Sequence, residues 1–408
     1  MSKSTRIVSA LFVITLLFAS ACAKSDSEKD NSQGSPGFAA PSGSIRGDIV
    51  TSSTLLNVSQ KDINILLLAY GLPAVSSGRS LTVYKIVYIT EDPGGAMIQG
   101  SGALVVPGGG GSMPIVSVSH GTMTNNSDAP SLLGEKILEA LWPAVNGYIA
   151  VIADYTGFGA SSGIMHPYLH ARSLASASLD MLRASNAFLL SIGQATNGKI
   201  FNMGYSEGGY AAMALQKDIE QNRSDEITLT ASALGAGPYD LSGSGAEKIE
   251  SETIPGVAYF VYVIVAYNET YRWGRGYNEI FKEPYASSLP GVYNGSQDIE
   301  QIGSQLTSVT ADLLQPGFIA DYKGDGERTL KNALVENNLL NWAPKTPTRL
   351  IHGINDQIVP YQNSVTARDS FAANGAGVEL VPCTQGAGDH GDCYLPFIYS
   401  AVGWFDRF

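Results

Sequence analysis

Apolar positions after residue 80 follow two alternating patterns. Short runs that are apolar at nearly every position are separated by longer stretches with helical spacing, such as residues 173–191 and 207–221. Continuous apolar runs are typical of strands that are covered on both faces in a largely parallel sheet. This alternation predicts a doubly wound α/β domain, in which helices flank a central sheet. The predicted strands are residues 81–90, 98–106, 114–119, 148–153, 199–203, 227–234, 348–352 and 378–381.

The alternation stops between residues 241 and 345, a stretch that is rich in aromatic residues. Its apolar positions mostly keep helical spacing, and a structureless loop of this length is improbable inside a compact domain. We therefore predict an insertion with its own, mostly helical structure at residues 241–345, which divides the core into residues 45–240 and 346–408. A chain of 408 residues suits one such domain better than two independent ones.

The first 21 residues have the pattern of an export signal. Lys3 and Arg6 precede an apolar run at residues 7–18, which is too short to span a bilayer. The run ends in Phe18-Ala-Ser-Ala-Cys22, which resembles a bacterial lipobox, where the cysteine is lipidated and becomes the first mature residue. Ordinary signal cleavage after Ala23 is the alternative, because small residues also satisfy that peptidase.

Residues 22–44 follow the signal and are polar, with many Ser, Gly and Pro residues. This composition cannot bury enough apolar surface to fold, so the segment is predicted to be a disordered tether. With a lipid on Cys22, the tether would join the folded domain to a membrane. Ala23 and Lys24 stand directly after Cys22 where an aspartate would be needed, so the inner-membrane retention signal of some bacteria is absent. We therefore expect a cell-envelope lipoprotein of the outer membrane, or a secreted protein.

The overall composition limits the kinds of partner and cofactor that we expect this protein to bind. Hydrophobic residues make up 44% of the chain and charged residues 15%, which is typical of a globular protein, and the formal net charge is −12. Phosphate binding needs a basic surface, so we expect no nucleic-acid partner. His166 and His170 have the i, i+4 spacing of a zinc motif, but Pro167 occupies the position where that motif needs glutamate. No metal or organic cofactor is predicted.

A G-x-S-x-G motif, Gly204-Tyr-Ser206-Glu-Gly208, lies between a predicted strand and a predicted helix. In this setting the serine sits on a sharp turn that exposes its hydroxyl, and side chains two positions away would collide, which explains the two glycines. The helix start also offers free N–H groups and a dipole that stabilise a developing oxyanion. Ser206 is therefore the predicted nucleophile.

A serine nucleophile needs a base, and the chain holds five histidines. Where this motif occurs, the order along the chain is serine, acid, histidine, and only His390 satisfies that order with the best acid. Asp356 is that acid, because it lies in the loop directly after a predicted strand. Asp389 and Asp392 share a tight loop with His390, from which a carboxylate rarely reaches back to the imidazole Nδ1. The excluded histidines are His120, His166, His170 and His352.

Two N–H groups are expected to hold the oxyanion. One belongs to Glu207, the residue after the nucleophile. The other is predicted in the loop after the third strand, where the N–H of Thr122 is the best placed and Gly121 lets the backbone approach. His120 is predicted to shape this turn rather than to transfer protons.

Cys383 and Cys393 are predicted to form a disulfide. They remain as an even pair once Cys22 is lipidated or removed, and export brings them into an oxidising compartment. They bracket a loop with several glycines that contains His390, so a crosslink would restrict the movement of the predicted base. Two free buried thiols are the alternative.

Four segments together resemble the secretory lipase family of α/β-hydrolases, which includes the fungal lipase A type. The resemblance extends from about residue 80 to the C-terminus, and it implies an α/β-hydrolase fold, ester hydrolysis and a helical cap before the acid-bearing strand. The family's catalytic triad falls on Ser206, Asp356 and His390, and Glu207 stands where the family more often has glutamine. The four segments are Ser119-His-Gly-Thr122, Ala153-Asp-Tyr-Thr-Gly-Phe-Gly159 with His166-Pro-Tyr-Leu169 downstream, Gly204-Tyr-Ser-Glu-Gly-Gly209, and His352-Gly353 with Asp356.

These observations predict a serine hydrolase that cleaves small-molecule or lipid carboxylic esters through an acyl-enzyme, as lipases and esterases do. A serine aminopeptidase or an acyltransferase on the same fold would carry the same triad, because specificity resides in the pocket. A binding lipoprotein without catalytic activity is a third alternative. The complete set of three triad residues argues against it.

Overall fold

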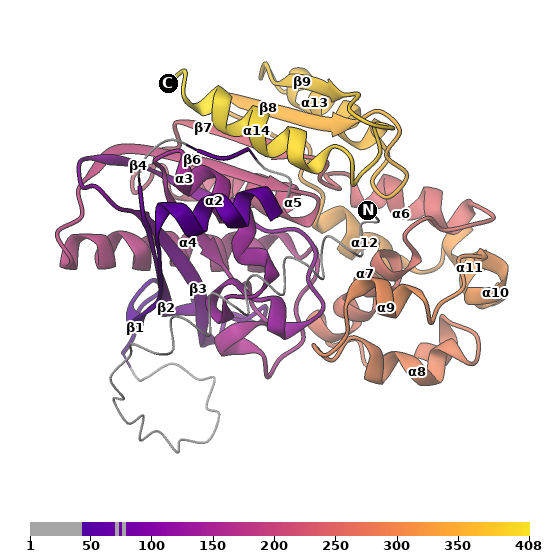
Figure 1. Cartoon of the computed structure of the whole chain (residues 1–408). Helices are drawn as coiled ribbons and strands as arrows, with labels where there is room; N and C mark the ends of the chain where they lie inside the picture. Colours follow the sequence, from indigo (N-terminus) through magenta and orange to yellow (C-terminus); the bar gives the residue numbers. More distant parts are fainter. Residues whose placement is uncertain (1–42, 70–72, 76–78) are drawn as a thin grey trace.

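The computed structural model describes residues 43–69, 73–75 and 79–408 of the chain. The predicted signal peptide, Cys22 and nearly all of the predicted tether lie outside the described residues. A single sheet with helices on both faces forms the core of the described part, and a group of shorter helices lies at one side of it (Figure 1).

The sheet has nine strands, in the order β1-β2-β3-β5-β4-β6-β7-β8-β9, within the described ranges. The pairs β1–β2, β2–β3 and β3–β5 are antiparallel. The remaining pairs, from β5–β4 to β8–β9, are parallel, which confirms the predicted fold class. The strands are β1 Ile49–Val58, β2 Leu81–Glu91, β3 Met97–Pro107, β4 Met113–Ser119, β5 Ile149–Ala153, β6 Thr196–Tyr205, β7 Ala231–Gly235, β8 Thr348–Gly353 and β9 Glu379–Cys383.

Each of the eight predicted strands overlaps one of the strands β2 to β9. The start of β7 differs, because Ile227 donates its N–H to the carbonyl of Arg223 in a turn after the preceding helix, and the strand begins only at Ala231. Neither β1 nor helix α2, Gln60–Ala69, was predicted from the pattern of apolar positions. Most side chains of β1 are exposed at the edge of the sheet, so this strand has no continuous apolar run.

Helices cover both faces of the sheet (Figure 1). All five residues of β5 are buried, and their side chains alternate between two apolar clusters: Val151 enters one, and Ile152 enters the other. This double coverage explains why β5 is a continuous apolar run in the sequence. The helices that pack on the sheet in the first cluster are α4 Ala171–Ser191, α5 Glu207–Asn222 and α13 Gln362–Ala373, and this cluster continues into the helices between β7 and β8. The helices of the second cluster are α2, α3 Leu141–Val145 and α14 Tyr394–Phe405.

The group of shorter helices lies in the chain between β7 and β8 and forms the side of the molecule drawn mainly in orange in Figure 1. Helix α7 is buried on nearly all sides, as expected of a helix that is apolar around its whole circumference. Its Tyr262 stacks on Tyr168 of the core at 4.4 Å and on Tyr293 at 4.6 Å between ring centres. These helices are α6 Leu241–Glu250, α7 Val257–Thr270, α8 Tyr285–Val292, α9 Ile299–Gly303, α10 Thr310–Leu313, α11 Pro316–Lys323 and α12 Arg328–Glu336.

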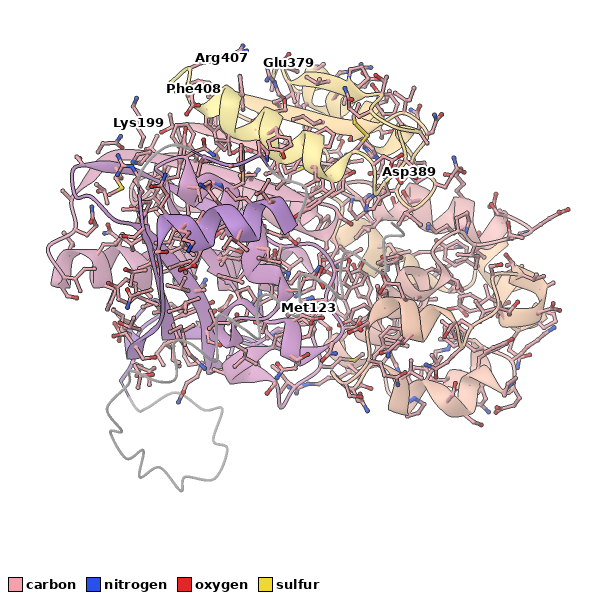
Figure 2. All side chains as sticks on the ribbon, in the orientation of Figure 1. Met123, Lys199, Glu379, Asp389, Arg407 and Phe408 are labelled. Atoms are coloured by element: carbon pink, nitrogen blue, oxygen red, sulfur yellow. A yellow bond between two sulfur atoms is a disulfide. The ribbon has the colours of Figure 1, made fainter. Side chains whose placement is uncertain are left out.

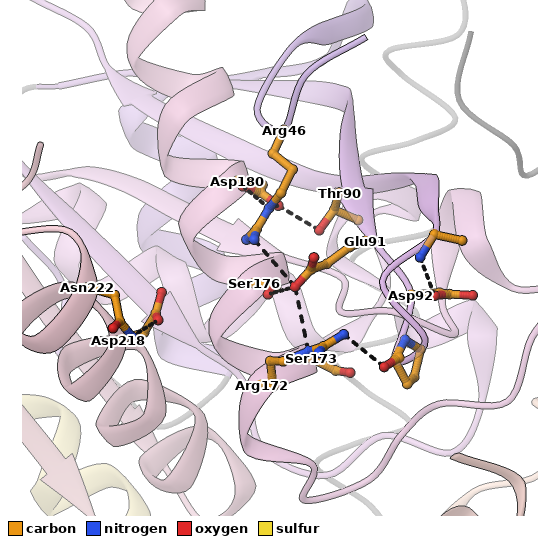
Figure 3. A network of polar contacts seen from close by, with 12 residues as sticks. Arg46, Thr90, Glu91, Asp92, Arg172, Ser173, Ser176, Asp180, Asp218 and Asn222 are labelled. Atoms are coloured by element: carbon orange, nitrogen blue, oxygen red, sulfur yellow. Dashed lines mark hydrogen bonds and ion pairs between the residues drawn. The ribbon is translucent and has the colours of Figure 1, made fainter. Parts of the chain in front are cut away.

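A polar network fixes the start of the described chain to the core (Figure 3). The guanidinium of Arg46 donates to Asp180 of α4 at 2.9 Å and lies 3.3 Å from Glu91 of β2. Thr90 donates to the same buried carboxylate of Asp180 at 2.8 Å. The segment before β1 is therefore joined to both β2 and α4. No helix in the described part of the chain combines the length and the apolar character needed to cross a bilayer.

Candidate active site

Ser206 lies on the tight turn between β6 and α5, with φ 61° and ψ −126°. Non-glycine residues rarely adopt a positive φ, and such strain is typical of functional sites. A Cβ atom on Gly204 would lie 2.2 Å from the carbonyl oxygen of Gly208, and one on Gly208 would lie 2.0 Å from that of Ser119. Both glycines are therefore required by close backbone contacts, in the way the motif predicts.

The structure brings Ser206, His390 and Asp356 together, although they are far apart in the sequence. His390 Nε2 lies 2.9 Å from Ser206 Oγ, and His390 Nδ1 lies 2.5 Å from Asp356 Oδ2. A carboxylate accepts hydrogen bonds, so Nδ1 carries the proton and Nε2 is free to accept one from the serine hydroxyl. This is the hydrogen-bond order of a Ser-His-Asp triad.

Asp356 is held in its ionised form. Its Oδ1 accepts hydrogen bonds from the N–H groups of Ile358 and Val359, each at 2.9 Å. Burial raises the pKa of Asp356, but hydrogen bonds from His352 and His390 outweigh that effect and lower the pKa to about 2. The acid therefore stays negative near neutral pH, and it can stabilise the imidazolium that forms during catalysis.

His352 supports the acid, which the sequence did not predict. Its Nε2 lies 3.3 Å from Asp356 Oδ2 and 2.8 Å from the carbonyl oxygen of Val359, and its Nδ1 lies 2.7 Å from Ser364 Oγ. His352 is the last residue but one of β8, and Asp356 lies four residues further on, in the loop. That spacing is the one local signal that could have linked them.

The loop after β4 lies beside the nucleophile, where the second oxyanion donor was predicted. A Cβ atom on Gly121 would be 3.9 Å from the Cβ of Ser206. The N–H of Gly121 already donates to the carboxylate of Glu139, at 3.1 Å to Oε1 and 3.3 Å to Oε2. The Gly121 N–H is therefore occupied, which leaves the next one, of Thr122, as the candidate. The hydroxyl of Thr122 lies 3.0 Å from that of Tyr168.

Glu139 is a second residue at the site that the sequence did not predict. It is 7% exposed, and burial raises the pKa of its carboxyl to about 7. Lys136 lies 3.9 Å away and favours the charged form. Glu139 lies in the 3-10 helix Glu135–Ala140, 18 residues beyond Gly121, and no local pattern in the sequence relates the two.

His120 occupies a structural position in the same loop. Its ring lies 4.1 Å from that of Tyr155, its Nδ1 is 2.9 Å from the carbonyl oxygen of Gly121, and its Nε2 is 3.3 Å from that of Asp154. Burial lowers the pKa of His120 to about 3, so the ring is neutral and its single N–H donates to one of these two carbonyl oxygens. These contacts fit a role in shaping the turn.

A disulfide joins Cys383, at the end of β9, to Cys393, which precedes α14. The loop between them carries His390, whose carbonyl oxygen accepts a hydrogen bond from the hydroxyl of Tyr205 at 2.8 Å. Asp389, the neighbour of His390, lies where the C-terminal part of the core meets the group of shorter helices between β7 and β8 (Figure 2). The base is thus fixed at both ends of its loop and at its own backbone.

A cavity opens beside Ser206, which lies in its lining together with Glu207. Its wall is mostly apolar. Helices α6, α7 and α12 supply most of that wall through Leu241, Ile249, Phe260, Ile264, Leu330 and Leu334.

Lys248 of α6 is a basic side chain in the wall of this cavity. It donates to the carbonyl oxygens of Pro255 and Ile358, at 3.1 and 3.2 Å. Burial lowers the pKa of Lys248 to about 8. Ile358 belongs to the loop of Asp356, so Lys248 connects the helices between β7 and β8 to the acid. Within the described ranges, no group of three or more His, Cys, Asp or Glu side chains is arranged to hold a metal ion.

The fold and the hydrogen-bonded serine, histidine and aspartate define an α/β-hydrolase. The chain belongs to the secretory lipase family, whose model matches residues 136–387, a segment that includes Ser206 and Asp356.

Curated relatives include two secreted triacylglycerol lipases of Malassezia globosa. LIP4 is 24% identical over 283 residues, which are 67% of this chain and 57% of the relative. LIP2 is 25% identical over 254 residues, which are 60% of this chain and 52% of the relative. The match with this chain thus spans little more than half the length of these relatives.

Solved structures with the same fold cover more of the chain. The rice cell wall degrading esterase LipA from Xanthomonas oryzae, in a ligand-bound form, is 30% identical with a TM-score of 0.80, over 90% of this chain and 99% of that one. Candida antarctica lipase A, at 16% identity and a TM-score of 0.65, covers 90% of this chain and 86% of that one, and it shows the shared fold.

Proposed function

We propose that this protein is a serine hydrolase that cleaves carboxylic esters through an acyl-enzyme. The observation that carries the proposal is the continuous hydrogen-bond chain from Ser206 through His390 to Asp356, at 2.9 and 2.5 Å. In this series of hydrogen bonds, each donor and acceptor has the orientation that activation of the serine requires. Membership of the secretory lipase family supports the same conclusion.

In the first step, Ser206 Oγ attacks the carbonyl carbon of the ester while its proton moves to His390 Nε2. The N–H groups of Glu207 and Thr122 stabilise the oxyanion that forms, and Asp356 stabilises the imidazolium. The imidazolium then gives its proton to the departing alcohol, and the acyl group remains on Ser206. In the second step, His390 takes a proton from water, the water attacks the acyl-enzyme, and the acid is released as Ser206 regains its proton.

We further propose that the apolar cavity beside Ser206 receives the acyl part of the substrate. Its wall consists mainly of hydrocarbon side chains from the predicted cap, residues 241–345, and burial of apolar surface is the interaction that such a wall offers. Two kinds of similar protein carry names that denote ester hydrolysis: the secreted triacylglycerol lipases and the cell wall degrading esterase. Small-molecule or lipid esters are therefore the proposed substrates.

A panel of p-nitrophenyl esters and aminoacyl-anilides, assayed with the purified protein, tests this function. We expect turnover of the esters, and at least 10²-fold lower kcat/KM for the anilides. Ser206→Ala is the matched control for background hydrolysis, since loss of the serine hydroxyl should lower kcat by several orders of magnitude. Preferential cleavage of anilides would instead establish an aminopeptidase.

We propose that the chain is exported through its first 21 residues and is anchored to the outer membrane by a lipid on Cys22. The secreted lipases among its relatives support export. The expressed protein should then partition into detergent and carry a mass increment at Cys22, and Cys22→Ser should lose both. An unmodified protein that begins at Lys24 would contradict the anchor and establish ordinary secretion.

A further inference from the structure

The carboxylate of Glu207 is buried directly beside the nucleophile. Its side chain is fully buried, and Oε1 lies 2.8 Å from His166 Nε2, whose side chain is 1% exposed. Its second oxygen, Oε2, is buried without a hydrogen-bond partner among the described residues. Burying an unpaired carboxylate costs free energy, and the contact with His166 is the interaction that offsets this cost for Glu207.

The hydrogen bonds of His166 set the number of protons that the pair holds. His166 Nδ1 lies 2.7 Å from the carbonyl oxygen of Thr156, which can only accept, so Nδ1 must carry a proton. The contact between Nε2 and Glu207 Oε1 needs one further proton, on the ring or on the acid. The pair is therefore either imidazolium with carboxylate or imidazole with carboxylic acid, and its net charge is zero in both forms.

This neutrality matters because Glu207 contributes its own N–H to the proposed oxyanion hole. A net negative charge on the same residue would oppose the negative charge that develops on the substrate oxygen. Electrostatic effects of this kind are strong in a buried site, where solvent does not screen them. The neighbouring rings of Tyr155 and Phe158 lie 5.9 and 4.8 Å from that of His166 and hold the imidazole in place.

We propose that His166 is a positioning residue for the oxyanion hole: it neutralises the carboxylate of Glu207 and holds the first residue of α5 in place. The inference rests on the proposed function, since the hole acts only when Ser206 attacks the carbonyl carbon of a substrate. It adds a residue that lies outside the triad and 41 positions from Glu207 in the sequence.

A double-mutant cycle over His166 and Glu207 tests the inference. We expect His166→Leu to lower kcat/KM about 10²-fold, within the range seen when an oxyanion donor is lost, with the change in kcat rather than in KM. Glu207→Gln keeps the N–H and removes the charge, so we expect a loss below about 10-fold. The double variant H166L/E207Q should be about 10-fold more active than H166L, because it has no unpaired charge.

His170→Leu is the matched control. His170 is also a buried histidine before α4, but its Nδ1 contacts the hydroxyl of Ser173 at 2.8 Å rather than a carboxylate. We expect its kcat/KM to change less than about 3-fold, and we expect no rescue by Glu207→Gln. If His166→Leu does not fold, as judged by its melting curve, His166→Gln replaces it. The amide can donate to Glu207 but supplies no additional proton, so the same loss and the same rescue are expected.

The rate at which a fluorophosphonate labels Ser206 should follow the same order across the four proteins of the cycle. If no ester is cleaved while the labelling rates keep that order, the proposed ester substrates are wrong and the role of His166 stands. Additive losses, in which H166L/E207Q is about 10-fold less active than H166L, would overturn the inference. Such additivity would mean that His166 acts through packing alone.

Discussion

The disulfide between Cys383 and Cys393 closes the loop that carries His390, and its effects on stability and on rate can be separated. Closing a loop with a sequence separation of 10 restricts the unfolded chain by about 2.7 kcal/mol at 25 °C. The unfolding entropy is about 2.1 cal/mol/K per residue near 60 °C. For roughly 360 described residues, the loss of the crosslink therefore corresponds to about 4 °C in melting temperature.

The effect on rate should be larger. His390 Nε2 must stay within hydrogen-bond distance of Ser206 Oγ, now 2.9 Å away, and a displacement of about 1 Å can lower a catalytic rate on the order of 100-fold. Without the crosslink, the loop keeps only hydrogen bonds such as that from Tyr205 to the carbonyl oxygen of His390. We therefore expect Cys393→Ser to lower kcat 10- to 100-fold while the melting temperature falls by only about 4 °C.

The assay compares kcat on a p-nitrophenyl ester with the melting temperature, for the wild type before and after mild reduction and for Cys393→Ser. The double variant C383S/C393S controls for the reductant, because reduction should not change it further. A kcat that stays at the wild-type value at a temperature where Cys393→Ser is folded would refute the reasoning. Two thiols that titrate in the native, unreduced mature protein would do so as well.

Two further predictions concern the residues that surround the triad. His352→Leu removes a hydrogen bond to Asp356, and we expect kcat/KM on a p-nitrophenyl ester to fall about 10- to 100-fold, with retention of full activity as the contrary result. Burial raises the pKa of Glu139 from 4.5 to about 7, so the folded protein favours the neutral acid. The stability that comes from protonation of Glu139 is therefore complete below about pH 4.5 and is lost as the pH rises through 7. Between these pH values, the free energy of unfolding of Glu139→Gln, measured with denaturant, should change by on the order of 3 kcal/mol less than that of the wild type. Identical pH profiles for the variant and the wild type would contradict this.

The sequence was sufficient for the fold class because the inner strands of a doubly covered sheet are themselves apolar runs. Strands β4 to β8 are recognisable in this way, and so is the position of Ser206 between β6 and α5. The exposed edge strand β1 carries no such signal, since its position depends on pairing with β2 rather than on its own burial.

His390 and Asp356 could be proposed from their order along the chain, because the fold imposes that order. The residues that surround them could not. Glu139 reaches Gly121 across 18 positions, and His166 reaches Glu207 across 41. Contacts of this kind depend on how loops pack over the sheet, and neither the periodicity of apolar residues nor a sequence motif predicts that packing.

The central claim is that Ser206 is the nucleophile, and covalent labelling tests it most directly. The purified protein is treated with a fluorophosphonate and digested, and the modified peptide is identified by mass spectrometry. The account predicts one adduct, on Ser206, which disappears in Ser206→Ala together with ester hydrolysis. Labelling that persists in Ser206→Ala, or an adduct on another residue, would contradict it.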